Sequence, residues 1–200
     1  MEEWEFKNTI GKFYSSLTGE NKKDYLTLFS DLQIEIEGWF RGELMNYLKN
    51  EKIKMTVYNR EAPINDNSRR KVNLRIEVNN EFYWIEIKDV LVGCQRNDIY
   101  KLEFYFSNNA YIHNDIKKLQ EIDKSNERQH GYSLAFISTN YSCDKCKNPK
   151  FKEINWKEDL EYQFDTITQN KPDIKQEASL VSWDYNNIQH FGYLLLGVNR

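Results

Sequence analysis

VNLRIEV at residues 72–78 and FYWIEIK at residues 82–88 are the two segments that decide the fold of this chain. In both segments every second residue is apolar, which is the pattern of a β-strand with two different faces. The residues between them, Asn79 and Asn80, favour a tight two-residue turn, so the segments are expected to form a hairpin. Alternation places Glu86 and Lys88 on one face of the second strand, and the isoleucines next to them on the other. A carboxylate beside an ammonium can hold a metal ion and position a water molecule.

The bulk composition indicates a single folded domain over residues 1–200. Few Gly and Pro residues and many aromatic ones are typical of an ordered α/β protein. The net charge of −3 lacks the basic excess of proteins that coat nucleic acid, but it is compatible with a local basic groove. Residues 1–7 do not resemble a signal peptide and no apolar run reaches membrane-spanning length, so a cytoplasmic protein without membrane contact is expected. Three cysteines, an odd number, fit reduced thiols in that compartment.

The remaining elements complete an α/β order. An apolar stripe at helical spacing predicts one long helix from residue 22 to residue 49. The further elements are expected as a strand at 52–58, a polar loop at 60–71, a helix at 110–122, a central apolar strand at 132–138, a helix at 154–168 and an apolar strand at 191–198. This order predicts a mixed β-sheet flanked by helices, in which a crossover helix makes the hairpin and the central strand parallel.

One acidic residue interrupts the apolar stripe of the long helix. Glu43 falls in the middle of the stripe, where a leucine would be expected, whereas Glu37 lies off its centre and is expected to be solvated. Because burying an unpaired carboxylate is costly, Glu43 should have a partner.

These features together resemble the PD-(D/E)XK nuclease superfamily, the restriction-endonuclease-like fold. The resemblance rests on an inward glutamate on the first long helix, a hairpin whose second strand ends in Glu-x-Lys, and an amphipathic helix followed by an apolar strand. It covers about residues 37–138, the catalytic core of that family, and implies an αβββαβ arrangement. It also implies a Mg²⁺-dependent endonuclease, with Mn²⁺ as an alternative ion, that hydrolyses DNA phosphodiester bonds by direct attack of water. RNA stays open as a substrate, and the family analogy points to bacterial restriction or anti-phage defence.

The family's functional positions map onto four residues of this sequence. Glu43 matches the first-helix glutamate, Glu86 the metal-binding acid, and Lys88 the lysine that orients or activates the attacking water. Asn73 stands where the family normally has an aspartate in the first hairpin strand. The resemblance therefore implies catalytic residues Glu43, Asn73, Glu86 and Lys88, with Glu43, Asn73 and Glu86 around the metal.

The asparagine weakens the expected metal site, because hard cations prefer charged oxygen ligands. Three interpretations of Asn73 stay open. It is an inactivating substitution made to trap a complex, a natural variant whose missing acid comes from Asp66 or Glu77, or the mark of a natural pseudo-nuclease that only binds.

Two other classes of function compete with the nuclease. One is a catalytically silent subunit that binds nucleic acid or docks onto a partner protein. The other is a purely structural domain in which Glu43 and Lys88 form a buried ion pair. For a nuclease, a homodimer is a natural expectation, since cutting both strands of a duplex needs two sites.

Several other motifs have ordinary explanations. Cys143 and Cys146 have the spacing of half a zinc site, but with Cys94 as the remaining cysteine no zinc is assigned. Asp115 near the start of a helix is expected to complement the helix dipole, and His113 to lie on the surface. Two basic clusters could contact phosphates. They comprise Arg69, Arg70 and Lys71, and Lys145, Lys147, Lys150 and Lys152.

Overall fold

One mixed β-sheet forms the centre of the protein. The computed structural model describes residues 6–17, 20–32, 36–52, 55–63, 71–95, 98–100, 102–106, 111–122, 128–140, 156–169, 179–184 and 189–198. The strands are β1 (Met55–Pro63), β2 (Lys71–Val78), β3 (Glu81–Gln95), β4 (Asp98–Tyr100), β5 (Gln129–Asn140), β6 (Ser179–Asp184) and β7 (Gln189–Val198). Their order is β1-β2-β3-β5-β7-β6, and β4 pairs with the end of β3. The β3–β5 pair is parallel and the others are antiparallel, which confirms the predicted mixed sheet.

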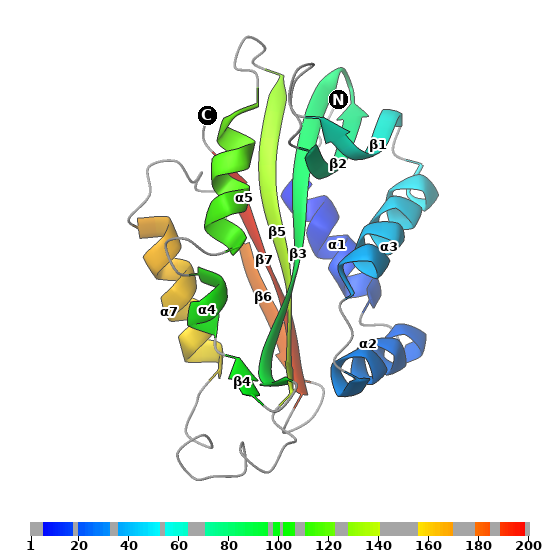
Figure 1. Ribbon diagram of the computed structural model, residues 1–200. Helices are drawn as coiled ribbons and strands as arrows, with labels where there is room; N and C mark the ends of the chain where they lie inside the picture. The colour runs from blue at the N-terminus through cyan, green and yellow to red at the C-terminus, as the bar shows by residue number, and fades with distance from the viewer. Residues whose placement is uncertain are drawn as a thin grey trace.

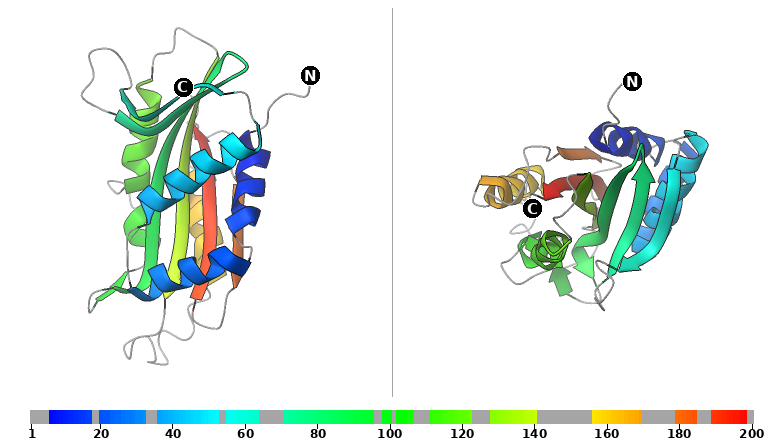
Figure 2. Two further views of the ribbon diagram at one scale, coloured as in Figure 1. Left: turned by 90° about the vertical axis from the view of Figure 1, so that its right-hand side faces the viewer. Right: turned by 90° about the horizontal axis from the view of Figure 1, so that it is seen from above.

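Helices cover both faces of this sheet (Figure 1). The helices are α1 (Phe6–Leu17), α2 (Glu20–Leu32), α3 (Glu37–Asn50), α4 (Leu102–Phe106), α5 (Tyr111–Gln120) and α7 (Trp156–Gln169). The first three lie on one face and the last three on the other, with α2 and α3 crossing the strands obliquely (Figure 2). None of the helices in the described ranges is both long and apolar enough to cross a membrane.

The alternation of β3 separates two hydrophobic cores. Ile85 and Ile87 belong to the core beneath α1, α2 and α3, whereas Trp84 and Val90 belong to the core beneath α4 and α5. The predicted division of this strand into two faces is therefore confirmed. Because β3 lies between β2 and β5 and is covered on both sides, its polar residues must find partners inside the protein.

The predicted hairpin is also confirmed. β2 and β3 pair in register from Leu74 opposite Ile85 to Val78 opposite Glu81. Asn79 and Asn80 connect them with positive φ angles of 54° and 64°. Two successive residues with positive φ give the turn a twist that matches the flanking strands.

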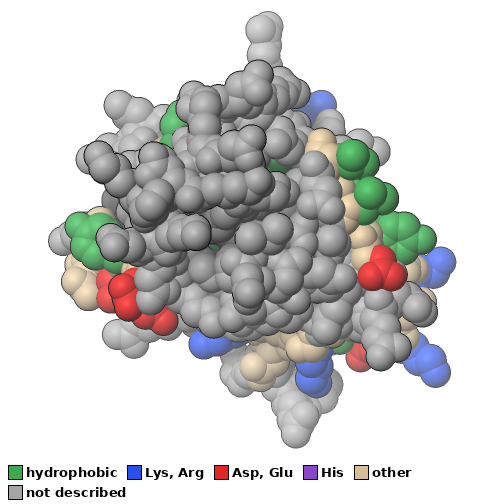
Figure 3. Space-filling model, turned by 90° about the horizontal axis from the view of Figure 1, so that it is seen from below, with side chains coloured by type: hydrophobic (Ala, Val, Ile, Leu, Met, Phe, Trp, Pro, Cys, Tyr) green, Lys and Arg blue, Asp and Glu red, His purple; other side chains and the backbone are tan. Residues whose placement is uncertain are grey.

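The predicted long helix is two helices. α2 ends at Leu32, and Ile36 precedes α3 with non-helical angles of φ −111° and ψ 9°. Three residues of the predicted stripe are exposed on α2, namely Tyr25, Leu28 and Leu32. In the view from below, a row of hydrophobic side chains lies along the right-hand edge of the molecule (Figure 3). The predicted strand at 52–58 is longer, as β1, and α1, α4, β4 and β6 lie outside the predicted elements.

The hairpin turn gives a direct test of the strand pairing. Asn80→Val should lower the free energy of unfolding by about 1–2 kcal/mol, because a left-handed backbone brings Cβ against the following carbonyl oxygen. Asn80→Gly should leave stability unchanged or raise it, because glycine adopts this conformation freely. Urea denaturation of the two variants measures the difference, and equal stabilities would contradict the turn.

Candidate functional site

Two contacts hold the start of α3 against the sheet. The backbone N–H of Ile36 donates to Asp89 Oδ2 at 2.8 Å, so a carboxylate lies at the helix N-terminus, where the helix dipole favours it. One turn further along, the Phe40 ring stacks on Phe136 with centroids 3.6 Å apart. Asp89 and Phe136 are directly paired across β3 and β5. The first helical residue, Glu37, is thereby placed beside β3.

Asn73 connects this glutamate to the hairpin. Its Nδ2 donates to Glu37 Oε1 at 2.8 Å, and its Oδ1 accepts from the Ile87 backbone N–H at 2.8 Å. The side chain of Asn73 continues the bonding between the strands past the last described backbone pair, Leu74 and Ile85. The amide therefore bridges β2, β3 and α3, and it uses both its donor and its acceptor to do so.

Glu86 lies on the opposite face of β3 from Ile87 and is 1 % exposed. Its Oε1 accepts from Lys118 Nζ of α5 at 2.5 Å. Burial raises the pKa of Glu86, and the hydrogen bond and charge of Lys118 oppose that rise. Lys88, two residues along the same face, has its Nζ 3.9 Å from Glu37 Oε2.

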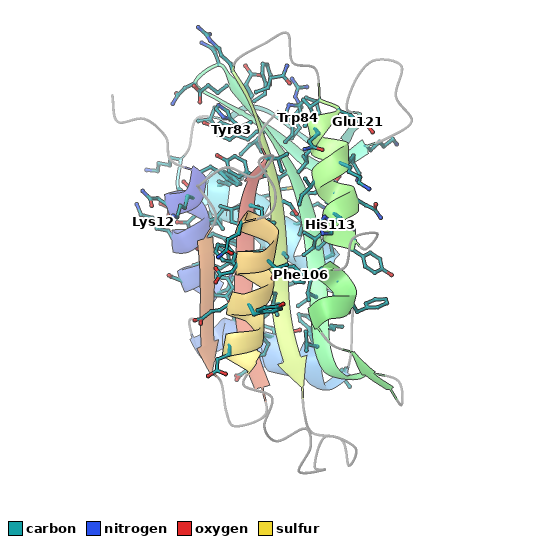
Figure 4. All side chains as sticks on the ribbon, turned by 90° about the vertical axis from the view of Figure 1, so that its left-hand side faces the viewer. Lys12, Tyr83, Trp84, Phe106, His113 and Glu121 are labelled. Atoms are coloured by element: carbon teal, nitrogen blue, oxygen red, sulfur yellow. The ribbon has the colours of Figure 1, made fainter. Side chains whose placement is uncertain are left out.

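α5 contributes a second buried carboxylate. Asp115 is 3 % exposed, and its Oδ2 has no hydrogen-bond partner among the described residues. Burial raises the pKa of Asp115 to about 7; the charges of Lys88 and Lys118 oppose the rise, and those of Glu86 and Glu37 add to it. The predicted helix-capping role of Asp115 is wrong, because the residue faces the sheet one turn into the helix. His113 is also buried rather than on the surface, and it lies on α5 well below Trp84 in the view of Figure 4.

The structure thus brings three of the four predicted site residues together and places the fourth elsewhere. Asn73 hydrogen-bonds to Glu37, and Lys88 lies 3.9 Å from it. The charges of Glu37 and Lys88 reach Glu86, which pairs with Lys118 of α5 near Asp115. Glu43 pairs with Lys22 of α2 at 2.5 Å. It has the partner that its position in the stripe predicted, but the expected Glu43–Lys88 pair is not formed. Six residues beyond Glu37, it lies about 9 Å further along the helix and about 120° around it.

The helix break explains why Glu37 and not Glu43 reaches the site. The predicted stripe took its direction partly from residues that now lie exposed on α2. The buried face of α3 carries instead Ile36, Phe40, Leu44 and Leu48. Each four-residue step advances about 40° around the axis, so the centre of this face lies nearer to Glu37 than to Glu43. Glu37, expected to be solvated, is partly buried and hydrogen-bonded.

The donor chemistry fits a hard divalent cation. Carboxylates of Glu37, Glu86 and Asp115, with the amide oxygen of Asn73, are the oxygen ligands that Mg²⁺ prefers. Asp115 Oδ2, which is buried and has no hydrogen bond to any residue that the structure describes, is the observation that favours a cation. Within the described ranges no three acidic, His or Cys side chains are already gathered as a metal-binding group. Lys118 instead supplies the positive charge beside Glu86.

Several predicted candidates lie outside the described residues. They are Asp66, Arg69, Arg70, Cys143, Lys145, Cys146, Lys147, Lys150 and Lys152. The sequence did carry a signal for the α5 residues, since the spacing of Asp115 and Lys118 places them on one helix face. That spacing is common on solvated helices as well. Only the packing of α5 on β3 indicates that the two side chains belong to the site.

Comparisons with protein-family models, with curated proteins and with solved structures found no match to this chain.

The buried Asp115 predicts a pH-dependent stability in cation-free solution. Its pKa is raised to about 7, so the folded state holds the proton more tightly than the unfolded chain. The stability from that proton is complete below the ordinary pKa of about 4 and is lost as pH rises to about 7. Asp115→Asn cannot ionise, so its stability relative to the unmodified protein should grow between about pH 4 and pH 7 and then level off.

Urea denaturation at a series of pH values in EDTA measures this difference. The same series on Asp24→Asn, which alters an exposed carboxylate of α2, controls for the loss of a negative charge. A stability difference for Asp115→Asn that does not change with pH would contradict the buried, proton-holding carboxyl group.

Proposed function

We propose that this protein is a divalent-cation-dependent hydrolase of DNA phosphodiester bonds, with Glu37, Asn73, Glu86 and Lys88 as its central residues. The observation that carries the proposal is the contact of Glu37 with both Asn73 and Lys88 where backbone pairing of β2 and β3 gives way to the Asn73 side chain, with the charges of Glu37 and Lys88 reaching Glu86. Compared with the sequence prediction, Glu37 takes the place of Glu43 as the helix glutamate.

The topology supports the restriction-endonuclease-like arrangement that we propose for the fold. The order α3, β1, β2, β3, α5, β5, with β4 and α4 between β3 and α5, is compatible with the αβββαβ core that the resemblance implies. β3 and β5 are parallel across the α5 crossover, and the helix glutamate lies beside the strand that carries Glu86 and Lys88. The bacterial defence role, the choice of DNA over RNA and a homodimeric assembly are extensions by analogy with the family.

The solvent exposure of each side chain limits the role that it can have in the proposed reaction. Mg²⁺ bound by Glu37, Glu86 and the Asn73 oxygen would offset phosphate charge and polarise water. Glu86 is buried and so can only hold a ligand in place. The Lys88 side chain is 26 % exposed, so its ammonium can donate to a water molecule or a phosphate oxygen that enters from solvent. Asp115 can take up a proton near neutral pH, because its carboxyl pKa is about 7.

A specific observation favours the second candidate, a silent subunit that binds nucleic acid or a partner. Asn73 already satisfies Glu37, and Lys118 already satisfies Glu86. These two carboxylates are therefore paired without a cation, which is compatible with a site that binds but does not cleave.

The two glutamates of α3 form a matched pair that tests the proposed site. Glu37→Gln should reduce Mg²⁺-dependent nicking of supercoiled plasmid by at least about 100-fold, because it removes a charged ligand. Glu43→Gln should leave nicking unchanged and lower stability by about 0.2–1 kcal/mol, since it breaks a partly exposed ion pair. Equal effects of the two substitutions on cleavage would refute the assignment of Glu37.

Asn73→Asp separates an enzyme from a silent subunit. The aspartate can still accept from the Ile87 N–H, but it cannot donate to Glu37, so two carboxylates come to face each other. Repulsion should lower the melting temperature in EDTA, and Mg²⁺ should restore it. For an enzyme, cleavage should rise by about tenfold or more, since the added charge improves the cation site. Restored stability without any cleavage would favour the silent subunit, and a loss of stability that Mg²⁺ does not restore would contradict both.

A further inference from the structure

Lys118 is the closest positive charge to the most buried carboxylate of the site. It lies in the last turn of α5, where the helix dipole favours a cation. Its Nζ is 2.5 Å from Glu86 Oε1 and 3.1 Å from the backbone oxygen of Lys71. The two side chains differ in their access to water, since that of Lys118 is 26 % exposed and that of Glu86 only 2 %.

The other positive charge of the site is engaged elsewhere. Lys88 Nζ lies 3.9 Å from Glu37 Oε2, and among the described residues its charge reaches Glu86 less strongly than that of Lys118. Removing the partner of a buried carboxylate leaves its negative charge uncompensated. The charged form of Glu86 therefore depends on Lys118 as long as no other cation is present. An ammonium at this distance also repels a divalent cation that approaches the same carboxylate.

The Lys118 ammonium can move away from Glu86 into solvent. The Lys118 stem is flexible and partly exposed, so its tip can turn to solvent without moving α5. Its second contact is to the carbonyl of Lys71, an exposed residue at the start of β2, where water can take its place. Glu86, in contrast, is held in the middle of β3 and cannot follow.

We propose that Lys118 is the resident counter-ion of Glu86, and that a divalent cation binds this site only by displacing its ammonium. The inference rests on the proposed function for the identity of the cation. It adds a positioning residue that none of the sequence motifs contains, and it makes Lys118 the group that sets how much free Mg²⁺ the site needs.

The test uses Lys118→Met, which keeps the stem and removes the charge, and Lys117→Met, which makes the same change at the exposed neighbouring position. Binding of Mg²⁺ is measured by titration calorimetry and by the shift of the melting temperature from EDTA to saturating Mg²⁺. Plasmid cleavage is recorded in parallel on the same samples.

In EDTA, Lys118→Met should melt below the unmodified protein, because Glu86 has lost its partner. It should bind Mg²⁺ at least about tenfold more tightly and gain more melting temperature from it, because the competing charge is gone. Lys117→Met should match the unmodified protein in both respects. If Lys118→Met folds only when Mg²⁺ is present, the cation has replaced the ammonium and the proposal is supported.

Three results would overturn the proposal. They are an Mg²⁺ affinity of Lys118→Met equal to or below that of the unmodified protein, no Mg²⁺ binding by any of the proteins, and a Lys118→Met protein that stays unfolded at saturating Mg²⁺. Cleavage by the unmodified protein with no gain in affinity in Lys118→Met would leave the nuclease standing and remove the role of Lys118. Tighter binding without cleavage would support Lys118 as the counter-ion and remove the nuclease.

Discussion

This structure depends on one constraint, a carboxylate in the middle of a strand that is covered on both faces. Glu86 lies on β3 between β2 and β5, where water cannot solvate its charge, so the protein must supply a partner. That partner, Lys118, comes from α5 on the facing layer. The helix packs closely on β5 nearby, since a Cβ at Gly131 would lie 3.4 Å from Leu119 Cβ, the residue after Lys118.

The same strand organises the other face of the sheet. Ile87 and Asp89 alternate with Glu86 and Lys88, and they bond to Asn73 and to the start of α3. Side-chain alternation therefore takes Asp89 to the α3 layer and Glu86 to the α5 layer, whereas Ile87 bonds through its backbone N–H and Lys88 pairs with Glu37 of α3. The place of Glu37 follows from this arrangement, since Asp89 holds the residue before it and Asn73 holds its carboxylate.

The predictability of the fold and of the site differs for physical reasons. The hairpin, the parallel pair and the mixed sheet could be predicted, because strand alternation and the Asn79–Asn80 turn are local signals. The direction in which α3 faces the sheet could not, because a helix break between residues 32 and 37 resets the phase of the apolar stripe. Asp115 and Lys118 acquire their environment only from the packing of α5 on β3, a long-range contact that no local spacing encodes.

Asn73 determines whether the site is stable without a cation. Its amide donates to Glu37 while Lys118 donates to Glu86, so these two carboxylates are satisfied by nitrogen donors from the chain itself. A site built in this way gains stability in the absence of metal and gives up affinity for it, because every donor that satisfies a carboxylate must be displaced or shared when a cation binds. An aspartate at position 73 would have the opposite effect. It would lower the stability of the site without a cation and raise its affinity for one. Residue 73 and Lys118 therefore both affect the equilibrium between the cation-free and the cation-bound site.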